Sequence, residues 1–272
     1  MGYFMNHGEA IVFTSGKGGV GKTTSAISIG AALSRMGKRV VLVDMDLGLR
    51  KLDIALGVND QLAYDIYDVI SERCTLYQAL FRDSRYYELY ILPASFRLLE
   101  EEDLHDQINQ IITDLKNDFD YVLIDCPAGI GRNFIYSVQA ADRALIVLTP
   151  DRASLRDGDR VADLLFDNGI KNSKLLINRY RYDLAESGDL MDIEEIINTL
   201  KIGIIGVVAE DDCVIKANYA GRPVLEDTDS QAAACFSNIA ARITGQDVPL
   251  YEPGRVKKRG FLRRLLSKKG EK

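Results

Sequence analysis

Residues 16–24 read Gly-Lys-Gly-Gly-Val-Gly-Lys-Thr-Thr, and this stretch determines the predicted fold. It fits the phosphate-loop pattern G-x-x-x-x-G-K-[ST]. Backbone N–H groups of such a loop, together with the N-terminus of the helix that follows, bind the phosphates of a nucleoside triphosphate. The predicted nucleotide-binding residues of the loop are Gly16, Lys17, Gly18, Gly19, Val20, Gly21, Lys22, Thr23 and Thr24.

The sequence on either side of the loop supports this interpretation. Residues 10–14 form a short apolar run typical of a buried strand, and apolar residues then recur at helical spacing from Ala26 until Gly37 ends the helix. In this strand–loop–helix context we expect Lys22 to neutralise the β- and γ-phosphates and the Thr23 hydroxyl to bind Mg²⁺. Lys22 is thus a predicted catalytic residue, and Thr23 is a predicted metal ligand.

A dinucleotide-binding turn is the main alternative, because Gly16, Gly18 and Gly21 also fit G-x-G-x-x-G and an acidic residue follows at a suitable distance. Two observations disfavour it. Lys-Thr-Thr follows the last glycine directly, and the acidic position is a pair, Asp44 and Asp46, rather than one ribose-binding carboxylate. The pattern does not require Lys17, which raises the question of whose phosphate this second lysine contacts.

Composition indicates a globular cytoplasmic protein. The chain has 272 residues, of which 47% are hydrophobic and 27% charged, and its four cysteines are scattered without a C-x-x-C pair. That spacing disfavours a zinc or iron–sulfur site and a disulfide framework. The net charge is −6, but residues 255–272 carry +8, so the rest carries −14. An acidic body with a basic tail is not typical of a general nucleic-acid binder, and we expect no specific nucleic-acid partner.

Strand-like apolar runs alternate with helical segments along the chain. Such runs, apolar throughout, predict an α/β fold with a doubly wound, mostly parallel sheet and helices on both faces. We predict a P-loop ATPase domain over residues 1–248, a linker over 249–254 and an amphipathic helix over 255–272. The predicted strands after the first cover 40–43, 89–92, 121–124, 144–148, 174–177 and 202–208.

Polar residues at the ends of these runs are candidates for catalysis. Of Asp44 and Asp46, one carboxylate is expected to orient the attacking water and the other to hold Mg²⁺-bound water or a lysine. Asp125 ends an apolar run in the Walker-B arrangement and is expected near Mg²⁺. Residues 127–129 then form a turn suited to sensing the γ-phosphate. Asn178 ends another strand, where its amide suits pairing with adenine, although Asn is also common in plain turns.

The last eighteen residues have the pattern of a membrane-binding helix. At about 100° per residue, four apolar side chains fall on one arc and most of the basic residues on the other. Burial of the four apolar side chains and attraction of the basic residues to anionic lipid nearly cancel the free-energy cost of ordering the helix. One tail should therefore bind the membrane weakly, and the two tails of a dimer should bind it far better. We therefore expect nucleotide-driven dimerisation to control binding to anionic lipid. The predicted membrane residues are Phe261, Leu262, Leu265 and Leu266.

With these motifs established, the chain resembles the deviant-Walker-A ParA/MinD family of ATPases over nearly its whole length. The resemblance lies in residues 16–24, 44–50, 92–95, 125–129 and 258–262. It implies ATP and Mg²⁺ as cofactors, an ATP-bound homodimer, and peripheral attachment to the inner face of the cell membrane. It also implies a role in division-site placement, with recruitment of a MinC-like septum inhibitor. Release then follows hydrolysis stimulated by a MinE-like activator or an alternative topological factor.

The resemblance assigns roles to individual residues. Lys17 is the signature lysine that reaches the phosphates of the partner subunit, Asp46 positions water, and Asp125 is the Walker-B acid. Two positions depart from the family pattern: Lys51 stands where many relatives have Asn, and residues 209–211 read Ala-Glu-Asp instead of Pro-Glu-Asp. These departures concern partner contacts and the base pocket.

Other functions remain open at this stage. A chromosome- or plasmid-partitioning ATPase has the same loop but ordinarily lacks the apolar-basic tail. A regulator of flagellar number has both, but usually carries an N-terminal activating helix, which we expect to be absent because only nine residues precede the first predicted strand. A metal–sulfur scaffold would need cysteine pairs. A recruitment scaffold without hydrolysis is disfavoured by Lys17 and Asp46.

Overall fold

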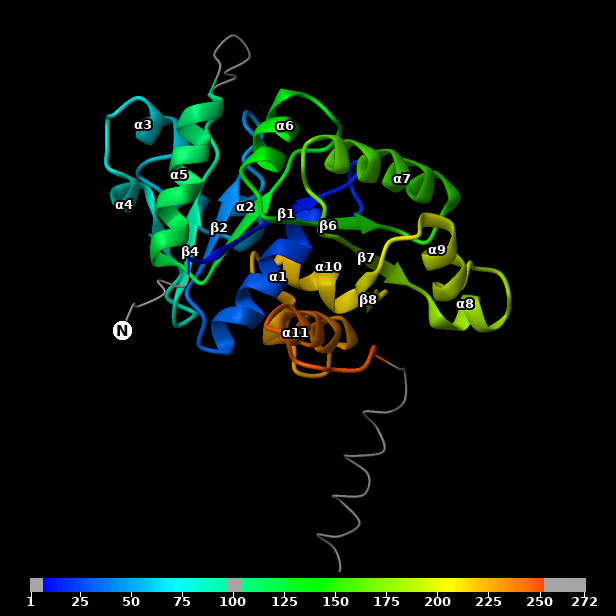
Figure 1. Ribbon diagram of the computed structural model, residues 1–272. Helices are drawn as coiled ribbons and strands as arrows, with labels where there is room; N and C mark the ends of the chain where they lie inside the picture. The colour runs from blue at the N-terminus through cyan, green and yellow to red at the C-terminus, as the bar shows by residue number, and fades with distance from the viewer. Residues whose placement is uncertain (1–6, 97–103, 252–272) are drawn as a thin grey trace, which may run out of the picture.

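The computed structural model describes residues 7–96 and 104–251. Eight strands form one sheet in the order β3-β4-β2-β5-β1-β6-β7-β8 (Figure 1). All neighbouring strands are parallel except β3 and β4, which are antiparallel. The strands are β1 (Glu9–Thr14), β2 (Val40–Asp44), β3 (Phe81–Arg82), β4 (Leu89–Leu92), β5 (Tyr121–Asp125), β6 (Arg143–Leu148), β7 (Ser173–Tyr180) and β8 (Ile204–Ala209).

Helices cover both faces of the sheet, with α6 and α7 above the strands and α1 and α11 below them in Figure 1. Two 3₁₀ turns, η1 (Asn59–Gln61) and η2 (Val224–Glu226), complete the described elements. The α-helices are α1 (Lys22–Arg35), α2 (Leu52–Leu56), α3 (Ile66–Ile70), α4 (Leu76–Ala79), α5 (His105–Asp118), α6 (Arg132–Gln139), α7 (Arg152–Asp167), α8 (Tyr182–Glu186), α9 (Ile193–Leu200), α10 (Asp212–Tyr219) and α11 (Gln231–Ile243).

The two layers follow from the alternation of side chains along each strand. In β1, Ala10 and Val12 belong to the apolar core under α5, α6 and α7, whereas Ile11 and Phe13 belong to the core under α1 and α11. All four side chains are fully buried, so the strand is apolar along its whole length. This confirms the predicted doubly wound, mostly parallel sheet with helices on both faces.

The structure differs from the prediction mainly at the ends of strands. The expected strand 202–208 starts two residues later, because Lys201 adopts a left-handed conformation (φ 54°) that ends α9 and directs the chain into a turn. β7 extends to Tyr180, three residues beyond the predicted run. The two-residue strand β3 was not predicted, since so short a segment has no apolar pattern of its own.

The segment predicted as a linker begins in contact with the ATPase domain. Arg242 donates hydrogen bonds to the carbonyl oxygens of Val248 (2.7 Å) and Pro249 (2.6 Å), and the Tyr182 hydroxyl donates to the carbonyl of Tyr251 (3.1 Å). The predicted membrane residues Phe261, Leu262, Leu265 and Leu266 lie outside the described residues, so the boundaries of linker and tail stay predictions. Within residues 7–96 and 104–251, no helix has the length and apolar character needed to cross a membrane.

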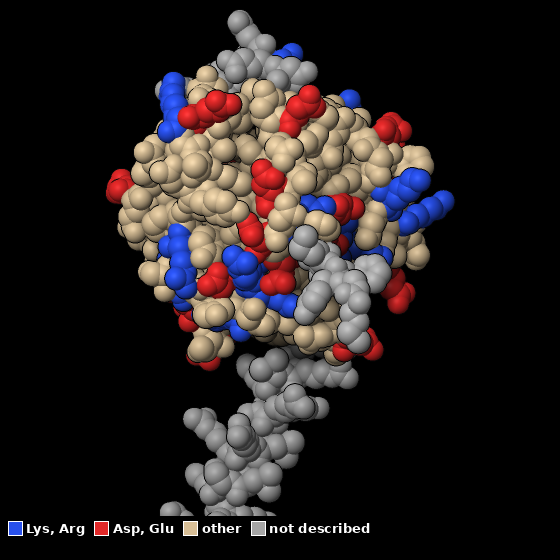
Figure 2. All heavy atoms as spheres, turned by 60° about the vertical axis from the view of Figure 1, so that its left-hand side comes forward, with Lys and Arg blue, Asp and Glu red and all other residues tan. Residues whose placement is uncertain are grey.

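Charged side chains of both signs are interspersed on the face shown in Figure 2. Ion pairs of the outer strands β2 to β4 and their flanking turns fit this pattern: Glu88 lies 3.7 Å from both Arg39 and Arg82, and Arg73 lies 3.3 Å from Asp68. Exposed pairs of this kind contribute little to stability. The apolar layers therefore hold the fold together.

Phe236 of α11 tests the contribution of the lower layer. Its side chain is 1% exposed, and we expect Phe236→Ala to lower the free energy of unfolding by about 3–5 kcal/mol, because the change leaves a cavity. Urea unfolding measures the loss. Phe166 on α7 is 67% exposed, and Phe166→Ala is the matched control, expected to change stability by less than about 0.5 kcal/mol. Equal losses in the two variants would contradict this account of the core.

Candidate nucleotide-binding site

The phosphate loop joins the end of β1 to the start of α1. Gly19 and Gly21 have positive φ angles of 77° and 99°, which side-chain-bearing residues rarely adopt. A Cβ at Gly21 would also overlap the Asn178 amide, and one at Gly16 would overlap Asp157 of α7. The loop therefore needs glycine at these positions both for its turn and for its close packing against β7 and α7.

The Lys22 side chain is held inside the loop. Its ammonium donates a hydrogen bond to the Ser15 hydroxyl (2.7 Å), which in turn donates to the Lys17 carbonyl (2.7 Å). Lys22 is only 8% exposed. Burial lowers the pKa of this ammonium, and the neighbouring Asp125 carboxylate opposes that shift. A buried cation with one neutral partner is well placed to receive an anion.

Thr23 and Asp125 form a pair of oxygen groups beside Lys22. The Thr23 hydroxyl donates to one Asp125 carboxylate oxygen (2.6 Å), while the other oxygen, Oδ1, is buried and has no hydrogen-bond partner among the described residues. Burial and the nearby Asp44 carboxylate raise the pKa of Asp125. Mg²⁺ prefers oxygen ligands and would compensate this buried negative charge, so the residues present fit the expected metal ion.

Asp44 supports the backbone of the loop after β2. Its carboxylate accepts hydrogen bonds from the backbone N–H groups of Asp46 (2.9 Å), Lys51 (3.0 Å) and Leu52 (3.0 Å). Burial raises the pKa of Asp44 despite these three donors. Both oxygens of Asp44 are thus used to fix residues 46–52, a structural role that its position in the sequence does not indicate.

Asp46 is the member of the acidic pair that faces a lysine. Its carboxylate oxygen lies 2.6 Å from the Lys51 ammonium. The Asp46 side chain is largely buried, whereas about half of the Lys51 side chain is exposed. Both residues lie close enough to Lys22 to affect its pKa, Asp46 raising it and Lys51 lowering it. Asp46 therefore lies next to the phosphate loop.

Lys17 lies at the outer edge of the loop and is paired within its own chain. Its ammonium is 3.1 Å from both carboxylate oxygens of Asp151, the residue that also caps the N-terminus of α7. The two side chains are 36% and 48% exposed. An exposed pair of this kind contributes at most about 1 kcal/mol, so another anion can readily replace Asp151.

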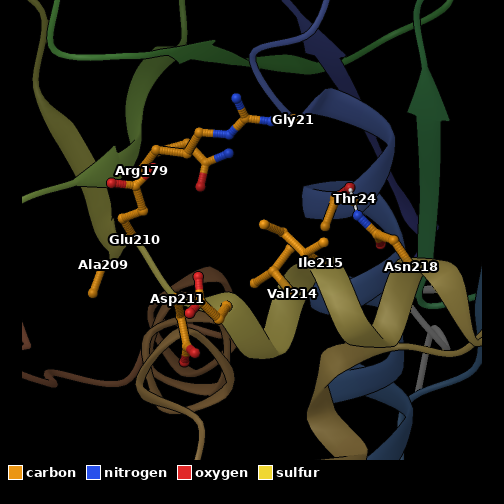
Figure 3. A pocket seen from close by; sticks show the side chains of 11 residues that line it. Gly21, Thr24, Arg179, Ala209, Glu210, Asp211, Val214, Ile215 and Asn218 are labelled. Atoms are coloured by element: carbon orange, nitrogen blue, oxygen red, sulfur yellow. Dashed lines mark hydrogen bonds between the residues drawn. The ribbon is translucent and has the colours of Figure 1, made fainter.

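A cavity of about 200 Å³ adjoins the loop on the side of α10 (Figure 3). Asn178 lines it, and its amide nitrogen donates to the Val20 carbonyl (2.7 Å), so one N–H group braces the phosphate loop. Asn218 of α10 donates to the Thr24 hydroxyl (3.4 Å) across the same cavity. The lining residues are Gly21, Thr24, Asn178, Arg179, Ala209, Glu210, Asp211, Asp212, Val214, Ile215 and Asn218.

The structure gathers most of the predicted site residues at one end of the sheet. Three further residues contribute to the site although they were not predicted from the sequence. Ser15 accepts from Lys22 and has no sequence signal, because serine before a glycine loop is unremarkable. Asp151 follows the β6 run and could have been found as an acidic residue at a strand end. Asn218 belongs to a helix far along the chain, and nothing in its local sequence indicates contact with Thr24.

A phosphate loop at the end of the central parallel strand β1, with acidic residues at the ends of β5 and β2, defines a P-loop nucleotide-binding protein. Family comparison agrees: residues 8–166 match the AAA domain family, and residues 95–243 match the family of the cellulose biosynthesis protein BcsQ.

Among individual proteins, the septum site-determining protein MinD of Bacillus subtilis is 46% identical over 245 residues, covering 89% of this chain and 91% of that protein. The structure of the MinC:MinD cell division protein complex of Aquifex aeolicus superposes with a TM-score of 0.84 at 39% identity, covering 90% of this chain and 100% of that one. The structure of MinD of Pyrococcus horikoshii complexed with Mg-ADP superposes with a TM-score of 0.78 at 28% identity, covering 86% of this chain and 95% of that one. The chain belongs to the MinD family of septum site-determining proteins.

We expect Asp125→Asn to stabilise the nucleotide-free protein at high pH. Because burial raises the pKa of Asp125, this group favours folding below its unfolded pKa, and that contribution is lost as the pH rises through the folded pKa. Asn keeps an acceptor for Thr23 and carries no charge. The stability gained from the substitution should therefore grow between about pH 4 and about pH 7, which urea unfolding midpoints measure.

The matched control is Asp60→Asn, at an exposed position, for which we expect little change in midpoint at any pH. If Asp125→Asn were less stable than the wild type throughout this range, a buried, incompletely compensated charge at this position would be the wrong description.

Proposed function

We propose that this protein is an ATP-dependent, membrane-associated ATPase that dimerises with ATP and takes part in placing the division site. The observation that carries the proposal is the arrangement of buried Lys22 and Asp125 with half-buried Thr23 at the phosphate loop. There an ammonium and a hydroxyl meet a carboxylate, one oxygen of which has no hydrogen-bond partner among the described residues. Membership of the MinD family supports the cellular role.

The phosphate loop would bind the triphosphate and its metal ion. Backbone N–H groups of residues 16–24 and the Lys22 ammonium would hold the phosphates, and the cavity beside Asn178 would receive the adenine. Thr23 and Asp125 would hold Mg²⁺, which when bound supplies positive charge to the β- and γ-phosphates. Asp46 would orient the attacking water by accepting its hydrogen bond.

Lys17 would complete the site of a second subunit. In the single chain its ammonium rests on Asp151, at the rim of the loop rather than inside it. A lysine that leaves an exposed carboxylate for a partner's phosphates links nucleotide occupancy to dimerisation. This accounts for the second lysine, which one triphosphate already held by Lys22 does not need.

The proposed dimer would control attachment to the membrane and to partners. The basic, leucine-containing tail of residues 255–272 would bind anionic lipid weakly as one copy and much more tightly as two. The MinC complex of the Aquifex relative supports a MinC-like septum inhibitor as partner. A MinE-like activator or an alternative topological factor would stimulate hydrolysis and release the protein to the cytoplasm.

We expect Lys17→Ala to abolish ATP-dependent dimerisation and to reduce lipid- and activator-stimulated hydrolysis by roughly 10³-fold, the scale of a cation supplied in trans. Light scattering with ATP and phosphate release measure the two effects. Binding of ADP to the single chain should change little, because Lys17 does not face the interior of its own loop.

Asp151→Asn is the matched control for Lys17. Asn keeps the cap of α7 but removes the carboxylate on which the lysine rests, so the dimer should form at equal or lower ATP concentration. Near-normal stimulated hydrolysis in Lys17→Ala would refute the cross-subunit role.

The tail is tested by adding one negative charge in two places. Leu265→Asp lies on the apolar arc, where losing a buried leucine removes roughly 1.5–3 kcal/mol, so liposome affinity with ATP should fall at least about tenfold. Ser267→Asp adds the same charge on the opposite arc and should have a much smaller effect. Equal pelleting of the two variants, or equal binding by the ADP and ATP forms of the wild type, would contradict the membrane switch.

A further inference from the structure

The ion pair between Lys51 and Asp46 brings a third lysine to the phosphate site. The Lys51 ammonium lies 2.6 Å from the Asp46 carboxylate, and about half of the lysine side chain is exposed to solvent. Its backbone is fixed, because the Lys51 N–H donates to the buried carboxylate of Asp44 (3.0 Å). The side chain can therefore change partner while its point of attachment stays in place.

The charges around this pair favour an incoming anion. The Lys51 ammonium is near enough to disfavour the charge on Lys22, the residue that holds the β- and γ-phosphates in the proposed function. An anion between two ammonium groups removes that repulsion.

We propose that Lys51 is a specificity-determining residue that distinguishes ATP from ADP. In the nucleotide-free protein its ammonium neutralises Asp46; when ATP binds, the ammonium moves to the γ-phosphate and releases the carboxylate to orient water. ADP lacks that phosphate, so with ADP the lysine stays on Asp46. This inference rests on the proposed ATP site and adds a discriminating residue to it.

The proposal is tested by substituting each partner of the Lys51–Asp46 ion pair in turn. Lys51→Asn removes the cation and should weaken binding of the non-hydrolysable analogue AMPPNP about tenfold, the scale of one charge-assisted hydrogen bond, with ADP changed less than about threefold. Asp46→Asn frees the lysine and removes a competing anion, so it should tighten AMPPNP binding, again with little effect on ADP. Affinities are measured by calorimetry with Mg²⁺ on full-length protein that carries Lys17→Ala in every sample, so that nucleotide-driven dimerisation does not contribute to the measured binding.

Two controls separate the effect from general charge. Lys51→Arg keeps a cation and should retain the AMPPNP preference, whereas Lys38→Asn removes a charge from a half-buried position beyond α1 and should change neither affinity. If Lys51→Asn weakens AMPPNP and ADP equally, or if both variants shift AMPPNP in the same direction, the proposal is wrong. Failure of the wild type to bind either nucleotide would instead refute the proposed function.

Discussion

The register of β1, β2 and β5 is the constraint on which the rest of the site depends. β5 pairs with both other strands, which sets Asp125 beside Phe13 on one side and beside Asp44 on the other. Because the strands are parallel, their carboxyl ends meet at one edge, directly under the loop that leaves β1. The apolar runs that bury these strands therefore also bring two carboxylates into a buried position where each disfavours the charge of the other.

These two buried carboxylates lower the stability of the ligand-free fold and favour the binding of a cation. Burial raises the pKa values of both Asp44 and Asp125, so the folded chain carries negative charge that it would hold more easily in water. Asp44 is compensated by three backbone N–H groups, whereas one oxygen of Asp125 has no partner among the described residues. The uncompensated oxygen is the one for which a metal ion with its nucleotide would supply the missing charge, which couples ligand binding to folding stability.

The sequence predicts the features that depend on neighbours in the chain. Strand runs, glycine spacing and an acidic residue at the end of β5 are local patterns, and the fold and the position of Asp125 follow from them. Contacts between residues far apart in the chain have no such local sequence pattern. Lys17 meets Asp151 from 134 residues away and Asn178 meets Val20 from 158. The sequence likewise makes Asp44 a candidate for catalysis. In the structure its carboxylate instead accepts hydrogen bonds from the backbone of residues 46–52.

The lysines of the site differ in a way that explains how one loop can respond to nucleotide. Lys22 is buried and bonded to a neutral hydroxyl, so it is fixed and always available to the phosphates. Lys17 and Lys51 lie farther out, each resting on a carboxylate of its own chain. Such partly exposed pairs are weak and keep the lysines neutralised without holding them tightly. In the proposed function, a multiply charged phosphate displaces either carboxylate, so the same binding event that fills the loop would also redirect two cations. Where those cations go, to the γ-phosphate or to a second subunit, then depends on which anions have arrived.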